Sequence, residues 1–173
     1  MKKKIIYITG GARSGKSTLA VKIAQETGKQ VEFVATCEPN DKEMKRRVKK
    51  HVESRPGEWN TLVETKDLSK ILPKINKRTE VVIIDCLTLY VSNLICSGKD
   101  EKQIIENIQK LLKALPGYCF TMIFVSNEVG SGIVPMNKLA REFRDIAGKV
   151  NQMVAGSSDE AYYMVSGLKI KLK

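Results

Sequence analysis

Short apolar runs along the chain alternate with segments in which apolar residues recur every three or four positions. The runs are rich in β-branched and aromatic residues, and "VVII" and "MIFV" are apolar throughout, which is typical of strands covered on both faces of a sheet. Alternation of such strands with helices predicts an α/β fold with a mostly parallel sheet. The expected strands are Ile5–Thr9, Val31–Ala35, Val81–Ile84, Thr121–Ser126 and Ala161–Ser166.

Helical periodicity marks four further segments. Lys16–Thr27 follows a glycine-rich turn, and Asp41–Glu53 is strongly basic and exposed on most of its circumference. Two more segments, at 104–115 and 139–150, each carry an apolar stripe at helical spacing. The stripes consist of Ile104, Ile105, Ile108, Leu111, Leu112 and Leu115 in the first segment and Leu139, Phe143, Ile146 and Val150 in the second.

The composition is that of a soluble globular protein. The chain has 173 residues, of which 42% are hydrophobic and 28% charged, values that exclude a disordered tail or a fibrous repeat. Its apolar runs are too short for a transmembrane helix, and "MKKKIIYITGG" is too short in apolar residues for a signal peptide. We therefore expect a cytoplasmic protein with no stable membrane insertion.

The net charge of +11 is concentrated in two places. Six lysines lie within four residues of one or other terminus, and Lys42–Lys50 contains six basic residues and one acidic residue. A large positive excess often indicates a nucleic-acid partner. Here the charge is local, and aromatic residues do not interleave with it as stacking on bases requires, so we expect no nucleic acid.

The four cysteines are widely spaced, and the chain has a single histidine. These numbers argue against a zinc site of standard Cys/His spacing. The cysteines are expected to be reduced and mostly buried. Cys37 and Cys86 each follow an expected strand, a position from which either can line a pocket without reacting.

The segment "GGARSGKS" matches the phosphate-binding pattern G-x-x-x-x-G-K-[ST] and lies between an expected strand and an expected helix. Gly10 and Gly15 let the backbone N–H groups wrap phosphate oxygens. Lys16 is expected to reach the β and γ phosphates and Ser17 to bind Mg²⁺. Residues 1–173 are therefore expected to form a single P-loop nucleotide-binding domain. The loop comprises Gly10, Gly11, Ala12, Arg13, Ser14, Gly15, Lys16 and Ser17.

Polar residues end two of the expected strands. Asp85 follows "VVII", the Walker-B arrangement that places a carboxylate beside the Mg²⁺ held by Ser17; the alternative is a simple cap of the following helix. Asn127 and Glu128 follow a second buried strand, at the edge where ligands of parallel sheets bind. Ordinary loop capping is the alternative for these two residues.

His51, the sole histidine, lies in the basic segment "RRVKKHVESRPGEW". Its position alone favours a structural or merely exposed residue. The surrounding cations, among them Arg46, Arg47 and Arg55, are suited to holding phosphates and to depressing the histidine pKa. That environment favours the neutral imidazole that acts as a nucleophile. A solvated helix face is the alternative for the basic run.

Five stretches of the sequence together resemble the bifunctional adenosylcobinamide kinase/adenosylcobinamide-phosphate guanylyltransferase family of cobalamin biosynthesis. The resemblance runs nearly end to end and in the order of the family. Tyr90 is one departure, because such proteins often have tryptophan there. The stretches are "GGARSGKS", "ATCEPNDKEMKRRVKKHVESRPGEW", "DCLTLYVSNL", "SNEVGSGIVPMNKLAREFRDIAGKVNQ" and "VSGLKIKLK".

The resemblance implies two reactions on one fold similar to RecA-type P-loop proteins. The first transfers the γ-phosphoryl group of ATP or GTP to adenosylcobinamide, and the second transfers GMP from GTP to that phosphate. It implies that His51 carries GMP covalently and that the protein forms a homo-oligomer, commonly a trimer. Besides the P-loop, the nucleotide contacts that it implies are Ala35, Thr36, Cys37, Val52, Glu53, Ser54, Arg55, Glu64 and Asp85.

Three other functions remain open at this stage. A small-molecule or nucleotide kinase without transferase activity explains the P-loop but gives His51 no role. A nucleic-acid-binding ATPase is motivated only by the net charge. A regulatory GTP-binding module is expected to hold GTP without turnover. The general base of the kinase step is not identified by sequence, and Asp85 and Glu128 are the candidates.

Overall fold

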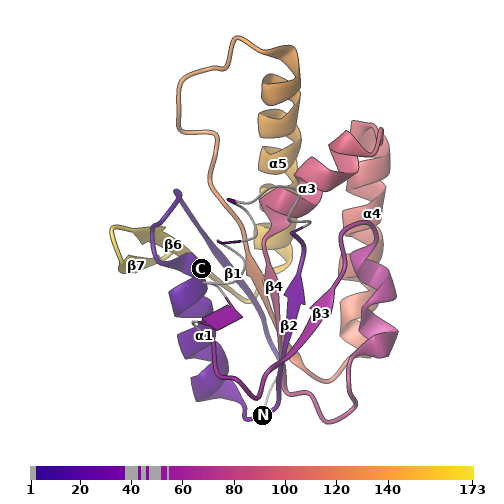
Figure 1. Ribbon diagram of the computed structural model, residues 1–173, viewed down its shortest axis with the longest axis vertical. Helices are drawn as coiled ribbons and strands as arrows, with labels where there is room; N and C mark the ends of the chain where they lie inside the picture. The colour runs from indigo at the N-terminus through magenta and orange to yellow at the C-terminus, as the bar shows by residue number, and fades with distance from the viewer. Residues whose placement is uncertain (1–2, 38–42, 44–45, 47–51, 54) are drawn as a thin grey trace.

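The computed structural model describes residues 3–37, 43, 46, 52–53 and 55–173. Within these residues, seven strands form one sheet in the order β3-β2-β4-β5-β1-β6-β7 (Figure 1). Strands β1 to β6 are parallel, and β7 runs antiparallel to β6. The strands are β1 Ile5–Gly10, β2 Val31–Ala35, β3 Asn60–Val63, β4 Val81–Asp85, β5 Thr121–Val125, β6 Glu160–Val165 and β7 Leu168–Lys171.

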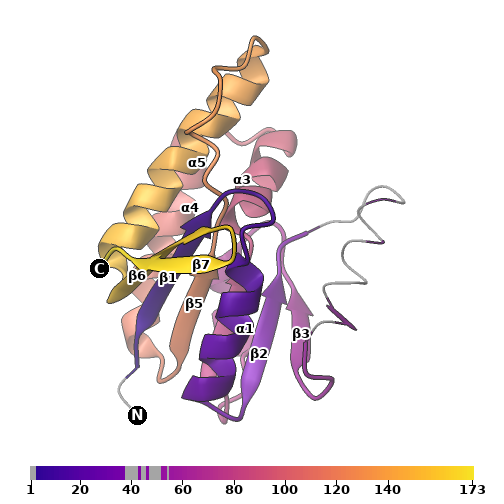
Figure 2. The ribbon, with the colours of Figure 1, turned by 90° about the vertical axis from the view of Figure 1, so that its left-hand side faces the viewer.

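Helices cover both faces of the sheet (Figure 2). Successive residues of a strand point to opposite faces, so Ile6 and Ile8 of β1 pack in the cluster that includes α1, whereas Tyr7 packs in the cluster that includes α3, α4 and α5. The mostly parallel α/β fold predicted from the sequence is thereby confirmed. The helices are α1 Lys16–Thr27, α3 Leu87–Cys96, α4 Glu101–Ala114 and α5 Lys138–Ser157, with 3-10 turns at Leu68–Lys70, Leu72–Lys74 and Leu115–Gly117.

The five expected strands are present, with ends that differ by at most one residue from the prediction. Two further strands, β3 and β7, were not predicted. Both are four-residue strands at the edges of the sheet. All of β7 and most of β3 is exposed, so neither carries the continuous apolar run that marks a central strand.

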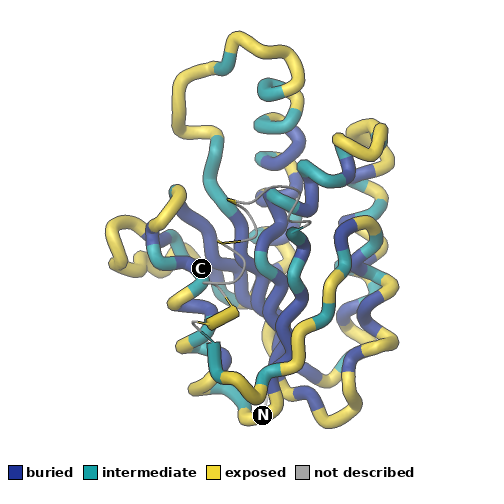
Figure 3. The backbone as a smooth tube through the Cα atoms, in the orientation of Figure 1, coloured by how far each residue is buried: buried dark blue, intermediate teal, exposed yellow. Residues whose placement is uncertain are grey.

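The helices α1, α4 and α5 agree broadly with three of the four expected segments, whereas α3 had no predicted bounds. The predicted helix Lys16–Thr27 is α1, but most of the expected segment 41–53 lies outside the described residues. In α5 the apolar stripe is fully buried only at Ile146 and Val150, and Leu139 is 54% exposed. The first part of α5 and the segment before it extend beyond the sheet (Figure 3). Leu139 lies in this first part of α5, where the sheet does not cover the helix.

The cysteine prediction is half correct. Cys86 is buried and Cys37 is half-buried, but Cys96 and Cys119 are exposed. Cys96 ends α3, and Cys119 lies in the turn before β5. Separately, within the described part of the chain no helix combines the length and the apolarity needed to cross a bilayer.

Candidate active site

The phosphate-binding loop joins β1 to α1 at the carboxyl edge of the sheet. Gly15 caps α1 with a φ of 95°, and Gly10 has a φ of 146°, backbone conformations that favour glycine. A Cβ on Gly10 would lie only 2.2 Å from the Met164 carbonyl oxygen of β6. The loop therefore passes against β6 so closely that only glycine fits at its first position.

Lys16 lies inside this loop rather than in solvent. Its side chain is 7% exposed, and Nζ donates a hydrogen bond of 2.6 Å to the Gly11 carbonyl oxygen. Burial lowers the pKa of Lys16, and the charge of Asp85 partly opposes that shift. The ammonium group is thus held over the loop by a backbone carbonyl, from which it can turn to a phosphate oxygen.

Ser17 and Asp85 bring the loop and β4 together. The Ser17 hydroxyl donates a hydrogen bond of 2.6 Å to Asp85 Oδ2. The N-cap of α3 is Cys86, so Asp85 does not serve as the helix cap that was its alternative role. A hydroxyl and a carboxylate with adjacent oxygens are ligands that Mg²⁺ accepts beside substrate phosphates. The predicted metal pair fits the ion.

A cavity of about 350 Å³ opens over the loop. Of the two polar residues after β5, only Asn127 lines it. Glu128 accepts a hydrogen bond from the Gly130 N–H through Oε1, and its own N–H donates to the Gly10 carbonyl. The loop-capping interpretation is therefore correct for Glu128. The cavity is lined by Arg13, Ser14, Gly15, Lys16, Ser17, Thr18, Asp85, Cys86 and Asn127.

Hydrogen bonds join the residue that follows β2 to the residue that follows β4. Thr36 is completely buried; its hydroxyl donates to the Cys86 carbonyl and accepts from the Cys86 N–H, both at 2.8 Å. Asn93 of α3 donates to the Thr36 carbonyl oxygen at 2.6 Å. Ala35 and Cys37 flank Thr36 and are half-buried. The structure thus gives the Thr36 hydroxyl a role in holding the Asp85–Cys86 segment at the cavity.

Arg55 is the described basic residue closest in sequence to the predicted nucleophile. Its guanidinium carbon lies 3.2 Å from the ring centroid of Phe33 in β2. Nε and Nη1 are buried and have no hydrogen-bond partner among the described residues. Burial lowers the pKa of Arg55 to about 10, and the charge of Asp85 opposes the shift. A buried guanidinium with unused donors is suited to bind an anion.

Five predicted site residues remain, four at positions 51–54 and one directly after β3. His51 and Ser54 lie outside the described residues, and Val52 and Glu53 are exposed. Glu64 follows β3, and its Oε1 accepts hydrogen bonds from the Lys66 and Asp67 N–H groups at 2.9 Å each. Of the described residues in this group, Val52, Glu53 and Glu64, none lines the phosphate cavity.

Sequence reasoning missed two polar side chains that support the site. Thr88 accepts hydrogen bonds from the Asn127 N–H and side-chain amide, at 3.3 and 3.0 Å. Asn151, buried in α5, donates to the Asn127 carbonyl oxygen at 3.1 Å. Both residues lie within stretches that carry the family resemblance, Thr88 in "DCLTLYVSNL" and Asn151 near the end of "SNEVGSGIVPMNKLAREFRDIAGKVNQ", but spacing alone does not show that either contacts Asn127.

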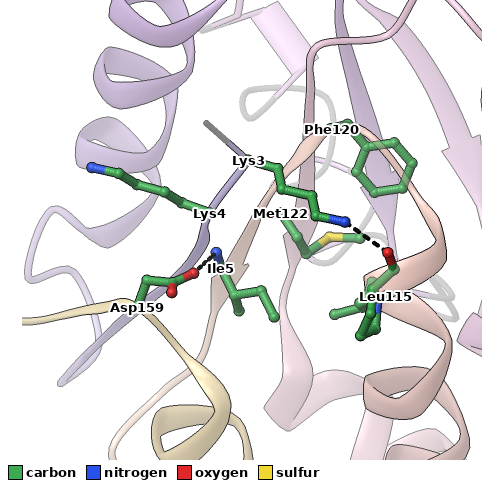
Figure 4. Close-up of a pocket in the computed structure, with 8 residues that line it drawn as sticks. Lys3, Lys4, Ile5, Leu115, Phe120, Met122 and Asp159 are labelled. Atoms are coloured by element: carbon green, nitrogen blue, oxygen red, sulfur yellow. Dashed lines mark hydrogen bonds between the residues drawn. The ribbon is translucent and has the colours of Figure 1, made fainter. Parts of the chain in front are cut away.

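A second cavity, of about 200 Å³, lies at the opposite edge of the sheet, at the starts of β1 and β5 (Figure 4). Its polar groups are already paired. Lys3 Nζ donates to the Pro116 and Tyr118 carbonyl oxygens, and Asp159 Oδ2 accepts from the Ile5 N–H at 2.7 Å. We therefore place the candidate active site at the phosphate loop.

The site defines a P-loop nucleotide-binding protein, since it combines a glycine-rich loop between strand and helix with a buried lysine and a strand-end aspartate. The order of the strands in the sheet is that of RecA-like proteins. Solved structures support this fold at low identity. A KaiC-like protein from Pyrococcus horikoshii OT3 has a TM-score of 0.56 and 17% identity over 92% of this chain and 70% of that one. An ATPase of the type III secretion system of pathogenic bacteria has a TM-score of 0.61 and 15% identity over 97% and 56%.

The chain belongs to the family described as cobinamide kinase / cobinamide phosphate guanyltransferase, which it matches over residues 6–172. It is 38% identical to the bifunctional adenosylcobalamin biosynthesis protein CobU of Escherichia coli K12, over 98% of this chain and 99% of that protein. It is also 38% identical to the bifunctional adenosylcobalamin biosynthesis protein CobP of Pseudomonas aeruginosa, over 96% and 95%. The family resemblance expected from the sequence motifs is confirmed.

Proposed function

We propose that this protein phosphorylates adenosylcobinamide with ATP or GTP and then transfers GMP from GTP to the product, giving adenosylcobinamide-GDP and pyrophosphate. Family membership over residues 6–172 supports the substrate and the two activities. The observation that carries the proposal is the phosphate cavity of about 350 Å³, which Lys16 and the Ser17–Asp85 pair line together.

In the kinase step the loop binds the triphosphate of the donor. Backbone N–H groups of the loop and the N-terminus of α1 point at the phosphates. Lys16 leaves the Gly11 carbonyl and pairs with the β and γ phosphates, where its charge offsets the charge that develops on the transferred group. Because the loop is already folded against β6, little reorganisation accompanies binding.

Ser17 and Asp85 would hold Mg²⁺ in this step. Their oxygens already lie 2.6 Å apart, so the two side chains could serve together as ligands of one ion. When bound, Mg²⁺ neutralises phosphate charge. Asp85 is fixed at the end of β4 by its neighbour Cys86, whose N–H and carbonyl both bond to Thr36.

In the guanylyl step His51 attacks the α-phosphorus of GTP and pyrophosphate leaves; the phosphate of adenosylcobinamide then displaces the histidine. The covalent intermediate separates two events in which anionic phosphates would otherwise approach one another. Arg55, with two unused buried donors, supports this step as the residue that binds a phosphate of GTP. His51 lies outside the described residues, so this assignment rests on the family resemblance.

The test supplies the wild-type protein with adenosylcobinamide, GTP and Mg²⁺ and resolves the phosphate and GDP forms of the product. Both are expected, the phosphate form first. Incubation with α-labelled GTP is expected to give acid-labile, alkali-stable labelled protein. A phosphate form alone, without labelled protein, would instead favour a kinase that lacks the transferase activity.

We further propose a cytoplasmic homo-oligomer, a trimer by the family resemblance. Large apolar side chains on the segment that precedes α5 support self-association, because Ile133 is 97% exposed and Met136 is 99% exposed. Exposed apolar patches of this kind commonly mark protein interfaces. Sedimentation equilibrium of the purified protein tests the trimer, and a monomer at micromolar concentration contradicts it.

A further inference from the structure

Asn127 lies where the two halves of the phosphate site meet. In the sheet, β5 lies between β4, which ends in Asp85, and β1, which leads into the phosphate loop. A residue that follows β5 therefore lies between the strand that carries Asp85 and the strand that leads into the phosphate loop. Asn127 is such a residue, and its side chain lines the cavity.

Hydrogen bonds to two helices hold Asn127 in place. Thr88 of α3 accepts from the Asn127 N–H, and Asn151 of α5 donates to its carbonyl oxygen. Asn151 is fixed in turn by the buried Ser126 hydroxyl at 2.6 Å. The next residue, Glu128, donates its N–H to Gly10 of the phosphate loop at 2.9 Å. The backbone of Asn127 is thus tied to α3, to α5 and to the loop.

The side-chain amide of Asn127 is only partly used by the protein. Its Nδ2 donates to Thr88 Oγ1 at 3.0 Å and approaches Cys86 Sγ at 3.9 Å. Its Oδ1 has no hydrogen-bond partner among the described residues. The unused atom is therefore an acceptor. A phosphate oxygen has no hydrogen to give it, whereas an attacking hydroxyl group does.

We propose that Asn127 orients the hydroxyl group of the phosphoryl acceptor, by accepting its hydrogen bond through Oδ1. This inference rests on the proposed kinase function and names a residue for its acceptor side. The hydroxyl oxygen forms the bond to the γ-phosphorus while the bridging P–O bond breaks, and its electrons leave with the nucleoside diphosphate. The proton passes to an oxygen of the transferred group and then to water, because a neutral amide does not take it.

Replacement of Asn127 is expected to separate the two activities. In N127A, kcat for phosphorylation of adenosylcobinamide falls on the order of 10- to 100-fold, because the acceptor hydroxyl loses its orientation. The KM for ATP changes less than about threefold, since the loop and Lys16 bind the donor. Guanylyl transfer to supplied adenosylcobinamide phosphate also changes less than about threefold, because no hydroxyl attacks in that step. Loss of structure alone would lower both activities together.

Two further variants make the test specific. Asn127→Ser is expected to behave like N127A, because it retains a short polar group beside Thr88 but lacks the amide oxygen. Asn107→Ala removes an asparagine whose side chain bonds to Tyr90 and Lys66 away from the cavity, and is expected to leave the ratio of the two activities unchanged.

The outcomes distinguish this inference from the proposed function. Two results overturn the inference alone. One is a wild-type kcat for phosphorylation in N127A or N127S, and the other is an equal loss of both activities in both variants. A wild-type protein that does not phosphorylate adenosylcobinamide overturns the proposed function and this inference with it. A selective loss of phosphorylation in both variants, with Asn107→Ala unaffected, establishes Asn127 as the residue that orients the acceptor.

Discussion

The Ser17 hydroxyl donates a hydrogen bond of 2.6 Å to Oδ2 of Asp85, 68 positions further along the chain. This bond joins the first turn of α1 to the end of β4, the two elements that would share Mg²⁺. The two proposed Mg²⁺ ligands are thus in direct contact, and substitution of either one tests its contribution.

Asp85→Asn retains an oxygen that accepts the Ser17 hydrogen bond but removes the negative charge. We expect kcat for phosphorylation to fall about 100-fold or more and the half-saturating Mg²⁺ concentration to rise about tenfold, because an amide is a weaker ligand than a carboxylate. A Mg²⁺ titration of the initial rate measures both. Asp145→Asn, on the exposed side of α5, is the matched control; equal effects of the two substitutions would contradict the metal assignment.

Gly10→Ala tests the close passage of the loop against β6. Its Cβ would approach the Met164 carbonyl oxygen to 2.2 Å, in a backbone conformation with φ of 146°. We expect a loss of about 2 kcal/mol or more in the free energy of unfolding, measured by urea denaturation. At Gly11 an added Cβ meets nothing within 4 Å, so Gly11→Ala is expected to change that free energy by less than about 1 kcal/mol.

Tyr90→Phe removes one buried hydroxyl group outside the phosphate cavity. That hydroxyl donates to Asn107 Oδ1 at 2.6 Å and accepts from the Leu68 N–H at 3.3 Å. We expect the free energy of unfolding to fall by about 1–2 kcal/mol, because the Asn107 side-chain oxygen and the Leu68 N–H lose their hydrogen-bond partner. We expect kcat to stay unchanged. Tyr118→Phe is the control, since the described residues offer its hydroxyl no hydrogen bond. An altered kcat in Tyr90→Phe would place Tyr90 in the site instead.

Arg55→Ala separates nucleotide binding from stability. The guanidinium is half-buried with two unpaired donors, and burial lowers its pKa to about 10. A cation whose pKa is lower in the folded state opposes folding at neutral pH, and that opposition begins to decrease only as the pH rises through about 10. At pH 7 we therefore expect Arg55→Ala to unfold no more easily than the wild type, while the KM for GTP rises about tenfold. A lower midpoint of urea denaturation with an unchanged KM would show a structural role.

The sequence predicts the elements that carry their own local signal. Val81–Asp85 is apolar until its last residue, and "GGARSGKS" has the composition of one kind of loop, so the positions of Asp85 and Lys16 follow from pattern alone. β3 and β7 were missed because exposed edge strands need no apolar run. The Thr88–Asn127–Asn151 contacts were missed for a different reason: they join α3, β5 and α5, whose proximity is set by packing and not by spacing.

We propose that this fold carries out two transfers, with Lys16 needed for both and His51 for the second only. The most direct measurement supplies Lys16→Ala and His51→Ala separately with adenosylcobinamide, GTP and Mg²⁺, and resolves the corrinoid products. Lys22→Ala, an exposed lysine on α1, is the control and is expected to form both products. We predict that His51→Ala accumulates adenosylcobinamide phosphate without the GDP form, and that Lys16→Ala forms neither. Formation of adenosylcobinamide-GDP by His51→Ala, or of either product at the wild-type rate by Lys16→Ala, would contradict the account.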